Sequence, residues 1–200
     1  EGARLSGATR MSFPHNDHAW VDDLLSRRRG DFERVLIVVE GLYSMDGDLP
    51  DLRGFVDVKR RHDAWMMVDE AHSLGVVGAT GRGIGEATGV AASEGVPSRA
   101  AVCLAAPLTA AADKALELLE TEPARVLRLQ ANGARLLAGI KAAGLNAGLG
   151  AGYSVLPVII GDSIGAAMLS DECFKRGLYA LPITFPAVPE REARLRFFLS

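Results

Sequence analysis

The sequence lacks several features that assign many proteins to a class at once. Its two cysteines, Cys103 and Cys173, stand far apart and form no CxxC pair, which argues against a disulfide framework and favours a reducing, cytoplasmic setting. No apolar run approaches the roughly 18 residues of a membrane span, and the first ten residues lack the apolar stretch of a signal peptide. Position 1 is not methionine, so we expect the chain to begin inside a longer protein.

An excess of positive charge is also absent. The chain has 22 Lys and Arg against 25 Asp and Glu, a formal net charge of -3, so its overall field favours neither nucleic acid nor an anionic membrane as partner. Short basic runs at 27–29 and 59–61 are interpreted as solvated helix ends. With 200 residues, 48% of them hydrophobic, the chain has enough apolar material for a core of one or two domains.

The clearest pattern is a strand, a helix and a second strand within residues 35–69. The β-branched run 35–39 shows no alternation and predicts a central parallel strand covered on both faces. Asp51 is placed to cap a helix over 52–62, and 65–69 predicts the next strand, packed in the core. Such a βαβ unit gathers its working groups at the carboxyl ends of the strands, which are 40–44 and 69–72 here.

The remainder of the chain predicts an α/β fold with a second, smaller α/β or α+β unit. Residues 75–89 are rich in glycine and predict an extended loop, whereas 90–108 show no clear pattern. Two helices, a strand, a helix and a final strand are then predicted over 109–120, 124–143, 155–160, 163–176 and 194–199. We therefore divide the chain into residues 1–108 and 109–200.

Two short motifs suggest chemistry that the rest of the sequence does not support. Residues 161–165 match the G-x-S-x-G of a nucleophile elbow, but that fold takes its base from a later histidine, and all histidines of this chain come earlier. We interpret Asp162 or Ser163 as a helix N-cap instead. The run His15-Asn16-Asp17-His18 has no third metal ligand nearby in sequence and predicts a turn that leads into a helix, so no metal site is expected.

Asp69-Glu70-Ala71-His72 is the best candidate for a site, because it follows a buried strand and offers a carboxylate and an imidazole together. A helicase-type DEAH box would also need a G-x-x-x-x-G-K-[ST] loop earlier in the chain, and there is none. The glycines between 78 and 85 also miss the register of a dinucleotide-binding G-x-G-x-x-G.

Longer strings at the two strand ends carry a resemblance. EGLYSMDGD at 40–48 and VDEAHSLGVVGATGRG at 68–83 resemble the α-oxoamine synthase family of pyridoxal-phosphate (PLP) enzymes. The resemblance implies an α/β fold of fold type I, with a mostly parallel sheet in a large domain and a small C-terminal domain. It also implies a homodimer and a reaction that joins an amino acid to an acyl thioester, of coenzyme A or an acyl carrier protein, with loss of carbon dioxide.

The resemblance also assigns roles to individual residues. Asp69 would pair with the pyridine nitrogen of PLP and keep it protonated, and His72 would hydrogen-bond the phenolic oxygen. Ser44 would lie beside the ring. Arg196 would grip the substrate carboxylate through two parallel donors, with Arg194 as the alternative.

One part of the family pattern is missing. The family binds PLP covalently through a lysine between the glycine-rich loop and the following helices, but residues 86–107 contain no lysine. Lys59, Lys114, Lys141 and Lys175 all fall in predicted helices. The chain as it stands would lack the Schiff-base anchor and the base for Cα, so we expect it to be inactive. A non-catalytic scaffold or regulatory subunit, or a class I/II aminotransferase, remain alternatives.

Overall fold

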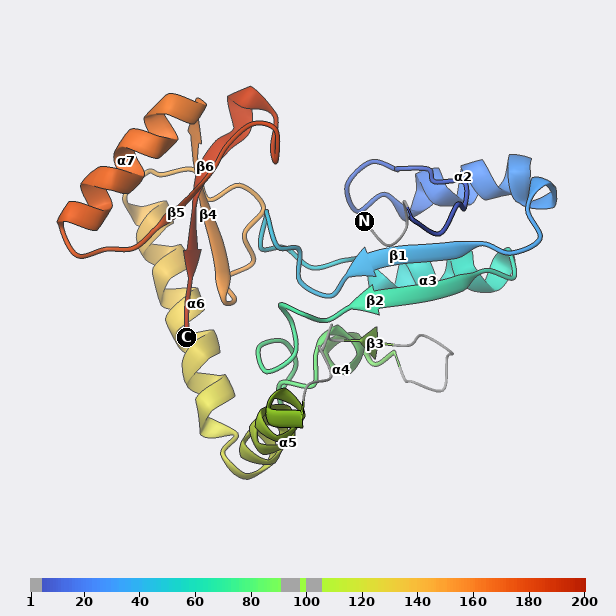
Figure 1. The fold of residues 1–200 in the computed structure, drawn as a ribbon, viewed down its shortest axis with the longest axis horizontal. Coiled ribbons are helices and arrows are strands. Elements are labelled where there is room, and N and C mark those ends of the chain that lie inside the picture. Colours follow the sequence, from blue (N-terminus) through green and yellow to red (C-terminus); the bar gives the residue numbers. More distant parts are fainter. Residues whose placement is uncertain (1–4, 91–97, 100–105) are drawn as a thin grey trace.

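The computed structural model describes residues 5–90, 98–99 and 106–200, which form two sheets with flanking helices (Figure 1). Cys103 and most of the segment 90–108, for which the sequence shows no clear pattern, lie outside these residues. The boundary that we placed after residue 108 falls inside α5 (Ala106–Thr121).

The first sheet is parallel, as the sequence predicts, and has the order β1-β2-β3. It consists of β1 (Leu36–Glu40), β2 (Trp65–Asp69) and the short β3 (Ser98–Arg99). Strands β1 and β2 are in register from Leu36 opposite Trp65 to Glu40 opposite Asp69. Their carboxyl ends therefore lie side by side.

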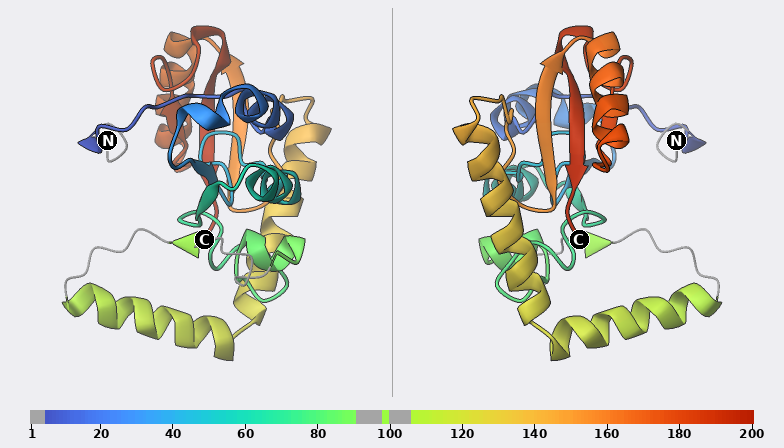
Figure 2. Two further views of the ribbon diagram at one scale, coloured as in Figure 1. Left: turned by 90° about the vertical axis from the view of Figure 1, so that its right-hand side faces the viewer. Right: turned by 90° about the vertical axis from the view of Figure 1, so that its left-hand side faces the viewer.

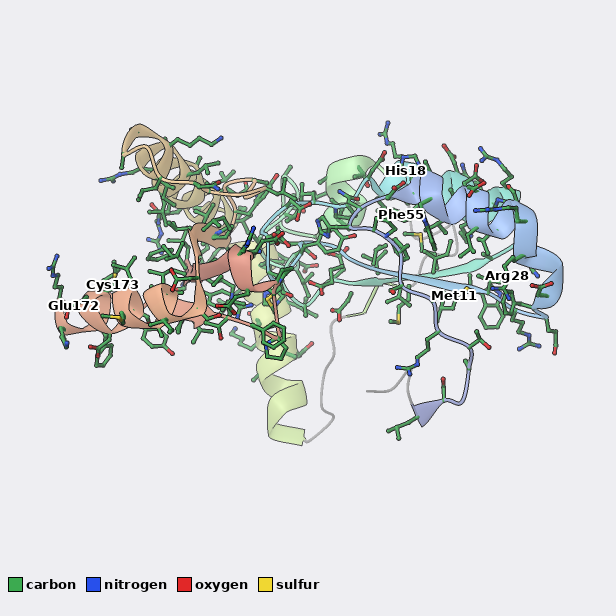
Figure 3. All side chains as sticks on the ribbon, turned by 90° about the horizontal axis from the view of Figure 1, so that it is seen from above. Met11, His18, Arg28, Phe55, Glu172 and Cys173 are labelled. Carbon is green, nitrogen blue, oxygen red and sulfur yellow. The ribbon has the colours of Figure 1, made fainter. Side chains whose placement is uncertain are left out.

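Helix α3 (Leu52–Arg61) joins these strands and begins where the sequence predicts. The Asp51 side chain accepts a hydrogen bond from the Gly54 backbone N–H, which satisfies one of the free donors at the start of the helix. Phe55, Val56 and Val58 are buried, as expected from the apolar spacing. Figure 3 shows Phe55 close to His18 of α2 (His18–Arg28), and their ring centroids are 5.9 Å apart.

The predicted turn at 15–18 is confirmed, because Asp17 caps α2 by accepting from the Trp20 N–H. Both basic runs begin in the last turn of a helix: Arg27 and Arg28 close α2, and Lys59 to Arg61 close α3. Cations in that position interact favourably with the helix dipole. Arg29 follows in a short 3-10 helix, η1 (Arg29–Asp31).

The expectation that β1 is covered on both faces is wrong for the described residues. Helices α2 and α3 pack against one face of the sheet, where Ile37, Val39 and Met66 are buried. On the other face Leu36, Val38 and Trp65 are about half exposed. Trp65 therefore does not pack in the core as predicted, although its neighbour Met66 does.

The glycine-rich segment also differs from the extended loop that we expected, because it contains the short helix α4 (Ile84–Thr88). The Glu70 carboxylate accepts from the Ile84 backbone N–H at 3.2 Å and supplies a partner at the start of this helix. Gly89 ends it in the left-handed conformation, with φ of 68°.

The second sheet is antiparallel, with the order β4-β6-β5. It contains β4 (Val155–Gly161), β5 (Leu181–Ile183) and β6 (Ala193–Phe198), and a 3-10 helix, η3 (Glu190–Glu192), precedes β6. The sequence predicts β4 and β6 but not β5. Strand β5 is only three residues long and includes Pro182, so it carries too short a pattern to recognise.

Helices α6 (Ala124–Ala142) and α7 (Ser163–Lys175) lie on the side of this sheet that faces away from β1 and β2 (Figures 1 and 2). Ile140 of α6 packs there with Leu156 and Val158 of β4. The opposite face, which carries Arg194 and Arg196, meets the loop after β1. Among the described helices, none is both long enough and apolar enough to cross a bilayer.

Candidate functional site

The carboxyl ends of β1 and β2 bring two acidic residues together. Glu40 and Asp69 are register partners, and the Gly41 N–H donates to the Asp69 backbone oxygen at 2.7 Å. Asp69 Oδ1 accepts the Ala71 N–H at 2.9 Å. Its Oδ2 makes no hydrogen bond with any described residue, so one oxygen of this half-buried carboxylate is available to another donor.

Ser44 is held against the same strand end by Glu40. The Ser44 N–H donates to Glu40 Oε2 at 2.8 Å, and its hydroxyl lies 3.5 Å from Glu40 Oε1. The loop is closed by hydrogen bonds from the Tyr43 N–H to the Asp48 oxygen and from the Gly47 N–H to the Tyr43 oxygen. Glu40 therefore connects Ser44, in the loop after β1, with the strand end that carries Asp69.

Glu70 is a structural residue of this site to which our sequence analysis gave no role. Its side chain is buried and accepts from the Ser73 hydroxyl as well as from the Ile84 N–H. A Cβ at Gly41 or at Gly83 would approach the Glu70 carboxylate more closely than Cβ atoms in proteins ever do. The only signal in the sequence is a charged residue at the end of an apolar strand, between two glycine-containing segments.

Arg194 is already engaged with the loop after β1. Its side chain is 3% exposed and forms an ion pair with Asp46. The guanidinium also donates to the Met45 backbone oxygen at 3.3 Å and to the Glu192 backbone oxygen at 2.9 Å. Its donors are therefore directed at the protein itself.

Arg196 has fewer partners. One terminal nitrogen, Nη1, donates to the Ser44 backbone oxygen at 2.9 Å. Its Nε is buried and has no hydrogen-bond partner among the described residues. Burial lowers the pKa of Arg196, while the nearby charge of Glu40 opposes this shift.

Phe198 joins the two halves of the site. Its ring stacks on that of His72, with centroids 6.0 Å apart and planes inclined by 16°. The Cζ atom of Arg196 lies 4.6 Å from the same centroid. The sequence analysis did not single out Phe198, although strand alternation places position 198 on the same face as 196.

A polar cluster lies under the loop after β1. His15 Nε2 and Asp48 Oδ2 are 2.9 Å apart, and the His15 ring contacts Tyr43 edge to face. Burial raises the pKa of Asp48, and His15 opposes this shift. Burial and the charges of Asp48 and Glu40 raise the pKa of Tyr43 to about 12.

The four lysines lie in helices, as the sequence predicts: Lys59 in α3, Lys114 in α5, Lys141 in α6 and Lys175 in α7. Lys114 pairs with Glu117, and Lys175 pairs with Asp171 and Glu172. The lysine-free interval 86–107 is described only in part.

The G-x-S-x-G string forms a helix start. Asp162 accepts from the Gly165 N–H at 2.6 Å, which confirms the predicted N-cap. The Ser163 hydroxyl donates to Glu190 Oε2 at 2.7 Å.

Comparisons with known proteins define the class to which this fold and site belong. The family model "Aminotransferase class I and II" matches residues 1–92. A solved serine palmitoyltransferase from S. paucimobilis, a lysine-to-alanine variant with a bound PLP–myriocin aldimine, aligns with a TM-score of 0.83 and 28% identity over 98% of this chain and 57% of its own. An 8-amino-7-oxononanoate synthase from Francisella tularensis, 20% identical with a TM-score of 0.74 over 99% of this chain and 65% of its own, shows the fold alone. The chain therefore has the fold of the fold type I PLP-dependent enzymes.

Curated relatives narrow the class to a family. The 8-amino-7-oxononanoate synthase of Methylobacterium nodulans is 36% identical over 220 residues, which cover 100% of this chain and 56% of that protein. The 2-amino-3-ketobutyrate coenzyme A ligase of Salmonella typhimurium is 31% identical over 233 residues, which cover 100% of this chain and 58% of that protein. The chain belongs to the α-oxoamine synthase family, whose members depend on PLP.

The chain spans little more than half the length of these relatives. The alignments extend over 220 and 233 residues, whereas this chain has 200. The relatives therefore carry residues inside the aligned region that have no counterpart here.

Proposed function

We propose that the chain is part of an acyltransferase that joins a small amino acid to an acyl thioester and releases carbon dioxide and a free thiol. The thioester would belong to coenzyme A or to an acyl carrier protein. One observation supports the proposal: residues named by the family resemblance gather where the two sheets meet. Arg196 donates to the backbone oxygen of Ser44, and both Arg196 and His72 contact the Phe198 ring. Ser44 is held by Glu40, which is the register partner of Asp69.

The described residues fit PLP at the positions that would hold its ring. Asp69 offers a carboxylate oxygen that no other described residue binds, at the carboxyl edge of a parallel sheet, where open α/β sheets bind ligands. That oxygen would accept the N–H of the pyridine and favour its protonated form, by about 1 to 3 pKa units for a close opposite charge. PLP supplies, when bound, a ring that takes up the electrons left on Cα of the amino acid.

His72 and Ser44 would complete the cofactor site. The His72 imidazole can donate to a phenolic oxygen, and Ser44 reaches the site from the loop after β1. Arg196 would bind the carboxylate of the amino acid, because its Nε has no partner among the described residues while the donors of Arg194 are engaged with the protein. We retain Arg196 and withdraw the alternative.

We further propose that residues 1–108 contribute to a large PLP-binding domain and residues 109–200 to the interdomain helix and the small domain. A homodimer with active sites near its interface is the proposed assembly. These proposals rest on the family and on the two sheets of opposite type.

The missing lysine leads to a second candidate function. Without a lysine between Glu86 and Pro107, the chain by itself has no amine at the family's position for the covalent attachment of PLP. A non-catalytic subunit that pairs with a complete family member would need the two sheets but not the catalytic lysine.

Titration with PLP tests the cofactor site. We expect reversible binding, visible in the absorbance spectrum, and no cofactor-modified peptide after borohydride reduction and digestion. Asp69→Asn should weaken binding about 10- to 100-fold, the value of a hydrogen bond to a charged group. Asp57→Asn, on the exposed side of α3, is the control. Equal affinity of Asp69→Asn and the unmodified chain would show that Asp69 does not bind PLP.

Activity assays separate the candidate reactions. With glycine and acetyl-coenzyme A, we expect no release of thiol from the chain alone, and release would contradict its inactivity. Exchange of an amino group with a keto acid, without thiol release, would indicate an aminotransferase. Comigration with a full-length family member in gel filtration would support the non-catalytic subunit.

A further inference from the structure

Phe198 occupies an unusual position between the two sides of the candidate site. Its ring stacks on that of His72, which lies in the turn after β2, and it contacts the Arg196 guanidinium of its own strand. Half of its side chain remains exposed, so burial in a core does not explain its position. The ring therefore has two polar neighbours that both carry proposed roles.

The guanidinium of Arg196 keeps donor capacity that the described residues do not use. Nη1 donates to the Ser44 backbone oxygen at 2.9 Å and lies 3.7 Å from the Met45 sulfur, and Cζ lies over the Phe198 ring. A guanidinium that stacks on an aromatic face keeps its N–H groups free, because they point outward in its own plane. The Nε of Arg196 is buried and has no hydrogen-bond partner among the described residues.

We propose that Phe198 is a positioning residue of the substrate site. It fixes the plane of the Arg196 guanidinium so that N–H groups without a partner among the described residues can meet an incoming carboxylate. The proposal rests on the proposed function in one respect, that Arg196 binds a carboxylate. Without the ring, Arg196 would keep the contacts of its Nη1 with the Ser44 oxygen and the Met45 sulfur, and the rest of the guanidinium would have to be ordered when the ligand binds.

Phe197 provides a matched control. It is the same residue type on the same strand, but it points to the other face of the sheet and packs with Leu156 and Val158. A Phe-to-Leu change can thus be made on either face of β6. Phe198→Tyr provides a second variant that keeps the aromatic face.

The first measurement is NMR of the chain without cofactor. The Arg196 Nε–Hε signal is assigned with Arg196→Lys, and the His72 ring signals with His72→Gln. Phe198→Leu should move both sets of signals, because the ring current that acts on them is lost. Phe197→Leu and Phe198→Tyr should leave them nearly in place. Unchanged Arg196 and His72 signals in Phe198→Leu would refute the contact on which the proposal rests.

The second measurement is a titration with sodium acetate at constant ionic strength, followed at the Arg196 Nε–Hε signal. Phe198→Leu should raise the acetate dissociation constant about two- to five-fold, the value of a cation–π contact at a partly exposed site. Phe198→Tyr should bind acetate as the unmodified chain does, and so should Phe197→Leu. An equal loss in both leucine variants, or acetate binding that does not affect Arg196, would overturn the proposal.

The proposed PLP site and the proposed role of Phe198 can be refuted independently of each other. Acetate binding needs no cofactor, so a chain that does not bind PLP can still show the dependence on Phe198. In that case the positioning role stands and the cofactor assignment falls. Conversely, PLP binding with an acetate affinity that is independent of Phe198 leaves the proposed function intact and removes the role of Phe198.

Discussion

The guanidinium of Arg194 pairs with the carboxylate of Asp46, a residue 148 positions earlier in the chain. The pair connects the central strand of the antiparallel sheet to the loop that follows β1. Next to it, the Ala151 N–H donates to the Gly47 backbone oxygen at 2.9 Å. The loop that carries Ser44 is therefore fixed both by strand β6, through Arg194, and by the segment before β4, through Ala151.

Removal of Arg194 should destabilise the chain markedly. Arg194→Ala leaves Asp46 without its counter-ion and the Met45 oxygen without a donor, so we expect the free energy of unfolding to fall by about 3 kcal/mol. This is the lower end of the range for buried pairs, because Asp46 keeps some contact with water. Urea denaturation measures the change, with the exposed Arg191→Ala as control. Equal stability of the two variants would mean that the pair contributes little.

Gly41 should not tolerate a side chain. A Cβ there would collide with the Ser73 hydroxyl and the Glu70 carboxylate, so Gly41→Ala should cost about 1 to 3 kcal/mol of stability. Gly139, within α6, has open space around its Cα. Gly139→Ala should stabilise the chain by up to about 1 kcal/mol because alanine favours the helix. Thermal unfolding of both variants tests the difference in sign.

Ionisation of Tyr43 should make the folded chain less stable in alkali. Its pKa is raised to about 12 from the ordinary value of about 10, so between about pH 10 and 12 the unfolded chain has lost the phenolic proton that the folded chain retains. The free energy of unfolding should therefore be unaffected by this group below pH 10 and fall as the pH rises toward 12. Ultraviolet titration of the folded chain should show a phenol step near pH 12.

Tyr43→Phe should remove that step and lessen the alkaline loss of stability. Tyr179→Phe, at a largely exposed position, is the control and should leave the step in place. A step near pH 12 that persists in Tyr43→Phe would assign it to another tyrosine.

The Asp162 cap should contribute more to the free energy of unfolding than a surface ion pair on the same helix. Asp162→Ala removes the acceptor of the Gly165 N–H and should cost about 1 kcal/mol. Asp171→Ala removes only the exposed pair with Lys175, worth about 0.3 to 0.5 kcal/mol. Urea denaturation of both variants gives the comparison, and a smaller effect at Asp162 would contradict the capping role.

Local signals in the sequence predicted most of the fold. The predictions of strand β2 and of the start of α3 are confirmed. Each rests on a signal that spans only a few residues, which is an unbroken apolar run for β2 and a capping aspartate for α3. Helix α4 was missed because its first N–H is satisfied by Glu70, fourteen positions earlier. The burial of both faces of β1 was predicted wrongly, since a run of apolar residues does not reveal which other segments cover it.

The candidate site was predicted in the same uneven way. The strings around Asp69 and Ser44 are contiguous and specific, so the family resemblance identified them. The commitment of Arg194 to Asp46, and the place of Phe198 beside His72, depend on contacts between distant segments. No local pattern reports such contacts, although strand alternation indicates that 194, 196 and 198 share a face.

Strand β6 is the middle strand of its sheet and is hydrogen-bonded along both edges. Its amide protons should therefore be among the slowest of the chain to exchange with solvent, because their exchange requires the hydrogen bonds of β6 to β4 and β5 to break. Arg196 thus lies on a strand whose backbone is hydrogen-bonded on both sides, while Ser44 lies in a loop. The backbone position of Arg196 should therefore stay the same whichever ligand the site receives.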